Sequence, residues 1–156
     1  MTTNLPALPG WLKYANRVVI LLQRLGLPLG TMHVLSVPGR RSGQMRTTPV
    51  SLLTVAGERY LVGGLITADW VQNARAAGWG SLRYGRRTER VGLVELPEEE
   101  RAPILRAFPW LVPQGVRFFQ RLYDLPTDPA LLPDAFAALA PRSTVFRVDS
   151  PPAART

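Results

Sequence analysis

The clearest potential for chemistry lies in one short stretch, Val37–Pro49. Its sequence, VPGRRSGQMRTTP, places two glycines among three arginines. Glycine permits a tight turn with exposed backbone N–H groups, and the arginine guanidinium donates paired hydrogen bonds to phosphate or carboxylate. Three hydroxyl side chains, Ser42, Thr47 and Thr48, add further donors. The stretch is typical of an anion-binding turn between two strands, and the alternative is an exposed turn whose arginines only maintain solubility.

The composition excludes most of the chemistry that side chains perform by themselves. The 156 residues include no Cys and one His, His33. Disulfides, thiolate nucleophiles, thiolate zinc sites and sites with several His ligands are therefore excluded, and we expect no metal centre. His33 has no recognisable acid to orient it, so a catalytic triad is not indicated and a structural role is expected. Such a chain favours chemistry supplied by a bound cofactor.

The charge distribution indicates an anionic ligand. The formal net charge is +8; residues 1–94 carry 12 basic and 3 acidic groups, whereas residues 95–156 carry 7 and 8. A positive field of this kind suits a phosphorylated cofactor, lipid head groups or nucleic acid. We do not expect nucleic-acid binding, because neither an ordered aromatic platform nor a known binding motif accompanies the charge.

A single domain of residues 1–150 is expected to position the turn. Residues 11–25 have apolar side chains at helical spacing, which predicts an amphipathic helix that covers the core or touches a membrane surface. The tail 151–156 is expected to fray. Alternation and turn residues predict six strands: Met32–Val37, Thr47–Val55, Arg59–Val62, Trp79–Tyr84, Thr88–Leu96 and Ser143–Asp149.

The remaining segments are expected to be helical. A short helix is predicted at Asp69–Ala77, with Thr67 or Asp69 as its N-cap. A helical insertion, 97–140, begins near Pro97 with a helix that Pro109 ends, and continues with helices at 114–123 and 130–139. Hairpin-linked strands interrupted by helices predict an α+β protein with an antiparallel, barrel-like sheet of about six strands, in which Pro49 marks an edge or bulge.

The order of these motifs resembles the deazaflavin-dependent nitroreductase family, an actinobacterial branch of the split β-barrel flavin and deazaflavin oxidoreductases. The resemblance rests on PGRRSGQMRTTP at 38–49, YLVGG at 60–64 and DWVQNARA at 69–76, in that order. It implies a split β-barrel with flanking helices that binds the reduced 8-hydroxy-5-deazaflavin coenzyme, coenzyme F420. It also implies hydride transfer to a hydrophobic acceptor such as a quinone, enone or nitroaromatic. The alternatives are an FMN-dependent reductase of the same fold and a non-catalytic carrier of a cofactor or lipid-like ligand.

The resemblance further implies which residues bind the cofactor. The turn 40–43, with Gln44 and Arg46, would hold the phosphate and the acidic tail of the cofactor. Thr48 and Pro49 would lie along its ribityl chain and ring, and the glycine pair 63–64 would let the backbone approach the ring. Residues at the start of the short helix would close the pocket. The implied set is Arg40, Arg41, Ser42, Gly43, Gln44, Arg46, Thr48, Pro49, Gly63, Gly64, Leu65, Trp70, Asn73 and Arg75.

The chain departs from the family pattern at Leu65-Ile66, where many relatives have a polar pair, and in the shortened segment before Trp70. The site near the reactive face would therefore be more apolar. No catalytic side chain is identified; Tyr123 is a candidate proton donor and solvent is the alternative. Five aromatic residues of the insertion either line an acceptor pocket or cover the barrel: Phe108, Trp110, Phe118, Phe119 and Tyr123.

Expectations about location follow from the N-terminal part of the chain. Residues 1–10 lack the features of a secretory signal, and the longest aliphatic run, Val18–Leu22, is too short to span a bilayer. We therefore expect a cytoplasmic protein, either a monomer or a homodimer. The alternative is a peripheral protein at the inner face of the cell membrane, attached through the helix 11–25.

Overall fold

A computed structural model of the chain describes residue 17 and residues 32–150. The expected helix 11–25, apart from Arg17, and the expected frayed tail 151–156 therefore lie outside the described residues. The strands are β1 (Met32–Pro38), β2 (Met45–Val55), β3 (Glu58–Gly63), β4 (Trp79–Tyr84), β5 (Arg87–Glu95) and β6 (Thr144–Asp149). The helices are α2 (Asp69–Ala77), α3 (Glu98–Leu111), α4 (Val116–Leu122) and α5 (Leu132–Ala137), with 3₁₀ turns at Pro113–Gly115 and Pro129–Leu131.

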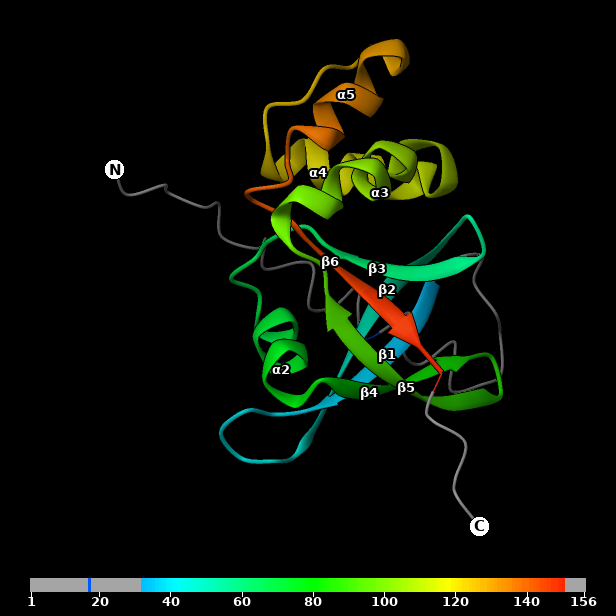
Figure 1. Ribbon diagram of the computed structural model, residues 1–156, viewed down its shortest axis with the longest axis vertical. Helices are drawn as coiled ribbons and strands as arrows, with labels where there is room; N and C mark the ends of the chain where they lie inside the picture. Colours follow the sequence, from blue (N-terminus) through cyan, green and yellow to red (C-terminus); the bar gives the residue numbers. More distant parts are fainter. Residues whose placement is uncertain (1–16, 18–31, 151–156) are drawn as a thin grey trace.

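The six strands form a closed barrel in the order β1-β2-β3-β6-β5-β4, and all neighbouring strands are antiparallel (Figure 1). Three hairpins, β1–β2, β2–β3 and β4–β5, join strands that are also neighbours in the sequence. The last strand, β6, closes the barrel between β3 and β5. This architecture confirms the predicted α+β barrel of about six antiparallel strands.

Pro49 lies where the ladder tolerates the loss of an N–H donor. Residues 45–51 of β2 pair with β1, and Pro49 stands opposite Val34; pairing with β3 begins only at Leu52. Within the described residues, the first half of β2 therefore pairs with a strand on one side only, as the predicted edge position requires. The β2–β3 hairpin turns through Ala56 and Gly57, which both have positive φ, at 51° and 82°. This is the backbone twist that a two-residue hairpin needs.

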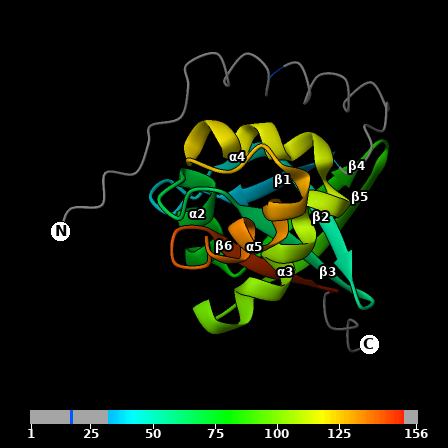
Figure 2. The same cartoon turned by 90° about the horizontal axis from the view of Figure 1, so that it is seen from above.

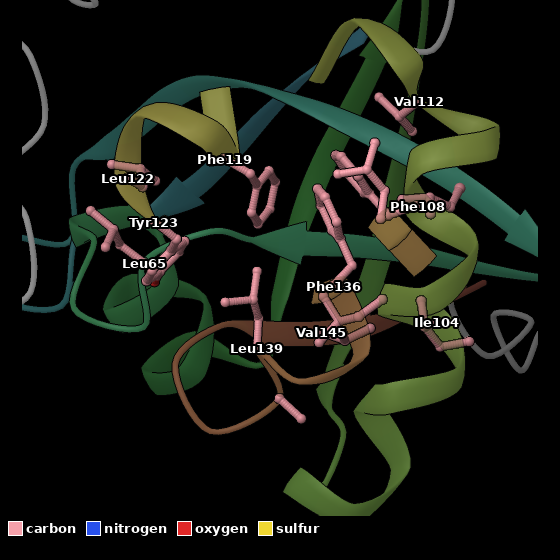
Figure 3. Packing of buried hydrophobic residues seen from close by; sticks show 14 of the residues in the cluster. Leu65, Ile104, Phe108, Val112, Phe119, Leu122, Tyr123, Phe136, Leu139 and Val145 are labelled. Atoms are coloured by element: carbon pink, nitrogen blue, oxygen red, sulfur yellow. The ribbon is translucent and has the colours of Figure 1, made fainter. Parts of the chain in front are cut away.

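The apolar side chains form two clusters. One fills the barrel and includes Leu35, Leu61 and Phe146, all fully buried. The other lies between the barrel and helices α3, α4 and α5, and includes Phe136 and Val145 (Figure 3). Figures 1 and 2 show these three helices gathered over one side of the barrel, whereas α2 lies apart from them beside β1, β4 and β5.

The helices differ from expectation in two details. Helix α3 does not end at Pro109 but continues to Leu111, because Phe108 and Val112 are buried and the Val112 N–H donates to the Phe108 carbonyl at 2.8 Å. Burial of the apolar side of the last turn outweighs the hydrogen bond that proline cannot make. The residue at the N-cap of α2 is Ala68, without a side-chain hydrogen bond, so the predicted caps Thr67 and Asp69 are wrong.

Candidate cofactor site

The turn between β1 and β2 is held by its own backbone. The Gly39 N–H donates to the Gln44 carbonyl at 2.7 Å, and the Gly43 N–H donates to the Gly39 carbonyl at 2.9 Å. The Ser42 hydroxyl oxygen accepts from the Gln44 N–H at 3.2 Å. Gly43 has a φ of 72°, a conformation that glycine adopts without steric cost. The N–H groups of Gly39, Gly43 and Gln44, which the sequence predicted to be exposed, are therefore engaged within the turn.

Helix α2 is fastened to this turn through Asn73 and Arg40. The Oδ1 atom of Asn73 accepts two hydrogen bonds from Arg40, one from the backbone N–H at 3.1 Å and one from Nη1 at 2.8 Å. The Nη2 atom of Arg40 also forms an ion pair with Oδ1 of Asp69 at 3.1 Å. Arg40 is therefore engaged by two residues of α2, although the sequence presents it as a free cation.

The amide nitrogen of Asn73 has no acceptor among the described residues. Because both partners of Oδ1 are N–H donors, that atom must be the oxygen, and the amide nitrogen Nδ2 faces the other way. No residue in the described part of the chain accepts a hydrogen bond from Nδ2, although Asn73 is only 5% exposed. A buried donor without an acceptor is costly, so an acceptor oxygen on a bound molecule would stabilise the site.

A pocket of about 560 Å³ opens between the turn and the first residues of α2. Its walls come from three segments: the turn, the start of β2 and the N-terminal part of α2. The residues that line it are Gly39, Arg40, Arg41, Ser42, Arg46, Thr47, Thr48, Ala68, Asp69, Trp70 and Asn73. Trp70 provides the largest apolar surface among them, and its ring also packs against Phe146 inside the barrel at a centroid separation of 5.9 Å.

Two cations in this pocket have no counter-ion in the part of the chain that the structure describes. Arg41 and Arg46 are exposed and form neither a hydrogen bond nor an ion pair with the described residues. The N-terminus of α2 adds a further positive potential at the same mouth, which Asp69 opposes. The pocket thus offers two guanidinium groups and one buried amide donor to an anionic or acceptor-rich ligand.

The structure brings seven of the predicted cofactor residues together around this pocket: Arg40, Arg41, Ser42, Arg46, Thr48, Trp70 and Asn73. Gly43, Gln44 and Pro49 belong to the same turn and strand but do not line it. The prediction omitted four lining residues, Gly39, Thr47, Ala68 and Asp69. All four lie within or next to the motifs at 38–49 and 69–76, so these sequence motifs could also have indicated the four omitted residues.

The glycine pair at the end of β3 is used differently from the prediction. A Cβ atom at Gly63 would lie 2.7 Å from Val71, and one at Gly64 would lie 3.0 Å from Phe118. Neither glycine lines the pocket; the protein's own helices α2 and α4 fill the space beside them. Leu65, 5% exposed, belongs to the core under α4 (Figure 3). The close approach that glycine permits here is made by helices, which sequence spacing alone does not reveal.

Arg75 also lies outside the pocket. Its Nε and Nη2 atoms donate to the two carboxylate oxygens of Glu95, both at 2.8 Å, and Thr144 donates its hydroxyl proton to Glu95 at 2.6 Å. The hydrogen bonds from Arg75 lower the pKa of Glu95, against the effect of partial burial. This network ties α2 to β5 and β6, so Arg75 supports the wall of the site instead of contacting its contents.

Tyr123, the candidate proton donor, has its hydroxyl turned into the protein. The hydroxyl donates to the Gly64 carbonyl at 2.7 Å, and the Ser143 hydroxyl donates to the same carbonyl at 3.1 Å. Burial raises the pKa of Tyr123. Phe108 and Phe119 are buried in the same cluster, so these aromatic residues cover the barrel, whereas Trp110 is 73% exposed. His33 stacks on Tyr84 at 4.6 Å, away from the pocket.

Two further observations concern the described residues only. They contain no group of three or more His, Cys, Asp or Glu residues that could hold a metal ion. None of their helices has both the length and the apolar character that crossing a membrane requires.

The family profile described as F420H(2)-dependent quinone reductase matches residues 15–118. The chain belongs to this family. The matched region contains the whole pocket, and it confirms the predicted deazaflavin-dependent, split β-barrel type of oxidoreductase. The F420H2-dependent quinone reductase family is named for its deazaflavin coenzyme, so the alternative of an FMN-dependent reductase gains no support. No curated protein matches the chain significantly.

Solved structures share the fold of this F420H2-dependent quinone reductase family member at low sequence identity. One is described as an F420-H2 dependent reductase (FDR-A), with 20% identity over 76% of this chain and 94% of the other, and a TM-score of 0.51. Another, described as a domain-swapped dimer, has 19% identity over 89% and 97% of the two chains and a TM-score of 0.54. A conserved hypothetical protein from Mycobacterium tuberculosis has 12% identity over 97% and 86%, with a TM-score of 0.52.

Proposed function

We propose that this protein binds reduced coenzyme F420 in the pocket beside the β1–β2 turn and reduces a quinone or a related hydrophobic acceptor. The observation that carries the proposal is that two guanidinium groups without a partner among the described residues, Arg41 and Arg46, line the same pocket as the buried amide of Asn73. When bound, the reduced coenzyme supplies the hydride. The protein then needs no nucleophile of its own, in keeping with a chain that has no Cys and one His.

Each wall of the pocket has a separate part in holding the ligand. Arg41 and Arg46 suit the phosphate and the acidic tail, because their planar donors match such oxygens. Asn73 Nδ2 suits a carbonyl or phosphate oxygen placed deeper, where it would satisfy the buried donor. Trp70 offers an apolar face that excludes water on one side. Thr47 and Thr48 add hydroxyl groups along the strand between these points.

The proton that accompanies the hydride is proposed to come from solvent. Among the described residues that line the pocket, Asp69 is the only acid, and its side chain is 89% exposed. The Tyr123 hydroxyl donates to the Gly64 carbonyl, and Tyr123 does not line the pocket. Positioning of donor and acceptor, together with exclusion of water by Trp70, is therefore the contribution of the protein to the rate.

Titration of the pure protein with reduced coenzyme F420, oxidised coenzyme F420 and FMN tests this proposal. We expect saturable binding of the deazaflavin and steady-state turnover with menadione. Arg41→Met should weaken coenzyme binding about tenfold at low salt, and the loss should shrink as salt is added. Arg86→Met, on the exposed β4–β5 turn, is the matched control and should bind normally. Absence of deazaflavin binding would overturn the proposal, and binding without turnover would indicate a carrier.

A further inference from the structure

One acidic side chain faces an otherwise basic pocket. Of the eleven residues that line it, three are arginines and Asp69 alone is acidic. Asp69 is the first residue of α2, and its carboxylate pairs with Nη2 of Arg40 at 3.1 Å. The proposed ligand is anionic, so the position of this carboxylate requires a physical explanation.

Asp69 is not needed to hold Arg40 in place. Arg40 is already fixed by two hydrogen bonds to Asn73, which is buried, whereas the Asp69 side chain is 89% exposed. An ion pair this exposed contributes little to stability, because water screens it and side-chain freedom is lost in forming it. The second carboxylate oxygen of Asp69 has no hydrogen-bond partner among the described residues. The carboxylate therefore acts chiefly through its charge.

We infer that Asp69 is a charge-opposing residue that lowers the affinity of the pocket for phosphate groups and keeps the cofactor exchangeable. The inference rests on the proposed function and extends it. A phosphate near Arg41 and Arg46 is repelled by Asp69, and it competes with Asp69 for the guanidinium of Arg40. A bare anion thus binds weakly, whereas a larger ligand compensates through Asn73 and Trp70. A coenzyme consumed once per turnover must leave after each cycle, and weakened anion binding speeds its dissociation.

The variant Asp69→Asn tests this inference because it keeps an oxygen for Arg40 and removes only the charge. We expect inorganic phosphate and oxidised coenzyme F420 to bind about three- to tenfold tighter at low salt. The gain should fade toward 1 M salt, where the screening length is about 3 Å. Oxidised coenzyme should also dissociate more slowly in stopped-flow displacement. Asp69→Ser, which keeps a polar side chain at the first residue of α2, should change affinity in the same direction.

Glu89→Gln is the matched control, because Glu89 is also an exposed acid paired with an arginine, Arg59. It lies on β5 opposite Leu82, toward the β4–β5 turn and away from the end of β1 that leads into the pocket. The Glu89→Gln variant should bind phosphate with the same affinity as the wild type. Thermal unfolding of all variants checks that each is folded.

Unchanged or weaker phosphate binding by folded Asp69→Asn overturns the inference, since Asp69 would then be neutral or would orient Arg40. An equal gain in Glu89→Gln also overturns it, because net charge alone would explain the effect. If wild type and variant bind phosphate as expected but neither binds the deazaflavin, the proposed function fails while the charge effect stands. If wild type and variant bind the deazaflavin equally well and release it at the same rate, the inference fails while the proposed function stands.

Discussion

The arginines of the β1–β2 turn differ in what their guanidinium groups contact. Arg40 is held by Asn73 and Asp69, whereas Arg41 and Arg46 have no partner among the described residues. At the scale of single residues, Arg40 therefore positions the turn, and the other two are available to a ligand. Tyr123 does not belong to the site, because its hydroxyl donates to the backbone carbonyl of Gly64 in the core.

Tyr123→Phe should lower stability while leaving the chemical step intact. The hydroxyl donates to the Gly64 carbonyl, which keeps a second donor, Ser143, after the substitution. We expect a loss of about 1 kcal/mol in the free energy of unfolding by urea. The kcat with menadione should stay within twofold of the wild type. A fall in kcat of tenfold or more would restore Tyr123 as the proton donor.

Sequence reasoning predicted an anion-binding turn at this position but could not assign roles within it. Two glycines and three arginines in a short stretch favour such a turn, and the structure places them beside a pocket. The partner that engages Arg40, Asn73, lies 33 residues further along the chain, and only the fold brings the two together. The amide of Asn73 becomes a buried donor for the same reason, since burial depends on how α2 packs against the barrel.

At the scale of elements, hairpins were predictable and helix packing was not. The turn at Ala56-Gly57 and the Gly85 turn between β4 and β5 follow from local sequence, and the strand boundaries agree within two residues. The fit of α2 and α4 against Gly63 and Gly64 depends on contacts between distant segments. Pro109 misled the prediction because burial of Phe108 and Val112 outweighs a local helix-breaking tendency.

Gly63→Ala should push α2 away from the barrel. The new methyl group would lie 2.7 Å from Val71 and 3.2 Å from Trp70, and both side chains are packed. We expect a loss of about 1–3 kcal/mol in the free energy of unfolding and weaker coenzyme binding, because Trp70 lines the pocket. Gly92→Ala is the control, since the nearest atom there is 3.6 Å away. Equal stability of the two variants would contradict the close packing of α2.

The ion pair between Arg75 of α2 and Glu95 of β5 should stabilise the fold in a pH-dependent way. Hydrogen bonds from Arg75 lower the pKa of Glu95 below its ordinary value of 4.5. The carboxylate therefore stabilises the fold above that ordinary value, and the contribution disappears as the pH falls through the lower, folded-state pKa. Glu95→Gln should cost stability at pH 7, and the difference from the wild type should shrink as the pH falls below 4.5 and vanish below the folded-state pKa. Urea unfolding across this range measures it; a difference independent of pH contradicts the role of the charge.

At the scale of the whole molecule, the barrel and the helical cover share one apolar cluster. Leu53 and Val145 come from barrel strands, yet they lie in the same cluster as Phe136 of α5. Figure 3 shows Val145 and Phe136 in this cluster. The cover is thus a continuation of the barrel's own packing. The sequence predicted a helical insertion at 97–140, but the surface that it covers became evident only with the fold.

Phe136→Ala should therefore destabilise the barrel and the cover together. The ring is fully buried and contacts both Phe108 and Phe119 at centroid separations of 5.3 and 4.8 Å. We expect a loss of about 3–5 kcal/mol. Hydrogen exchange followed by mass spectrometry should show β-strand amides and α3 amides losing protection by the same amount. Loss confined to α3–α5 would instead indicate that the cover unfolds independently.

The position of β6 has a consequence for how the chain is made. Around the barrel the strands lie in the order β1-β2-β3-β6-β5-β4. Until β6 is present, β3 and β5 therefore each lack one neighbouring strand. Synthesis proceeds from the N-terminus, and β6 begins only at Thr144. A nascent chain that has completed five strands therefore carries two unpaired strand edges, which are sites of aggregation. On the ribosome the barrel can therefore close only after its last strand, β6, has emerged.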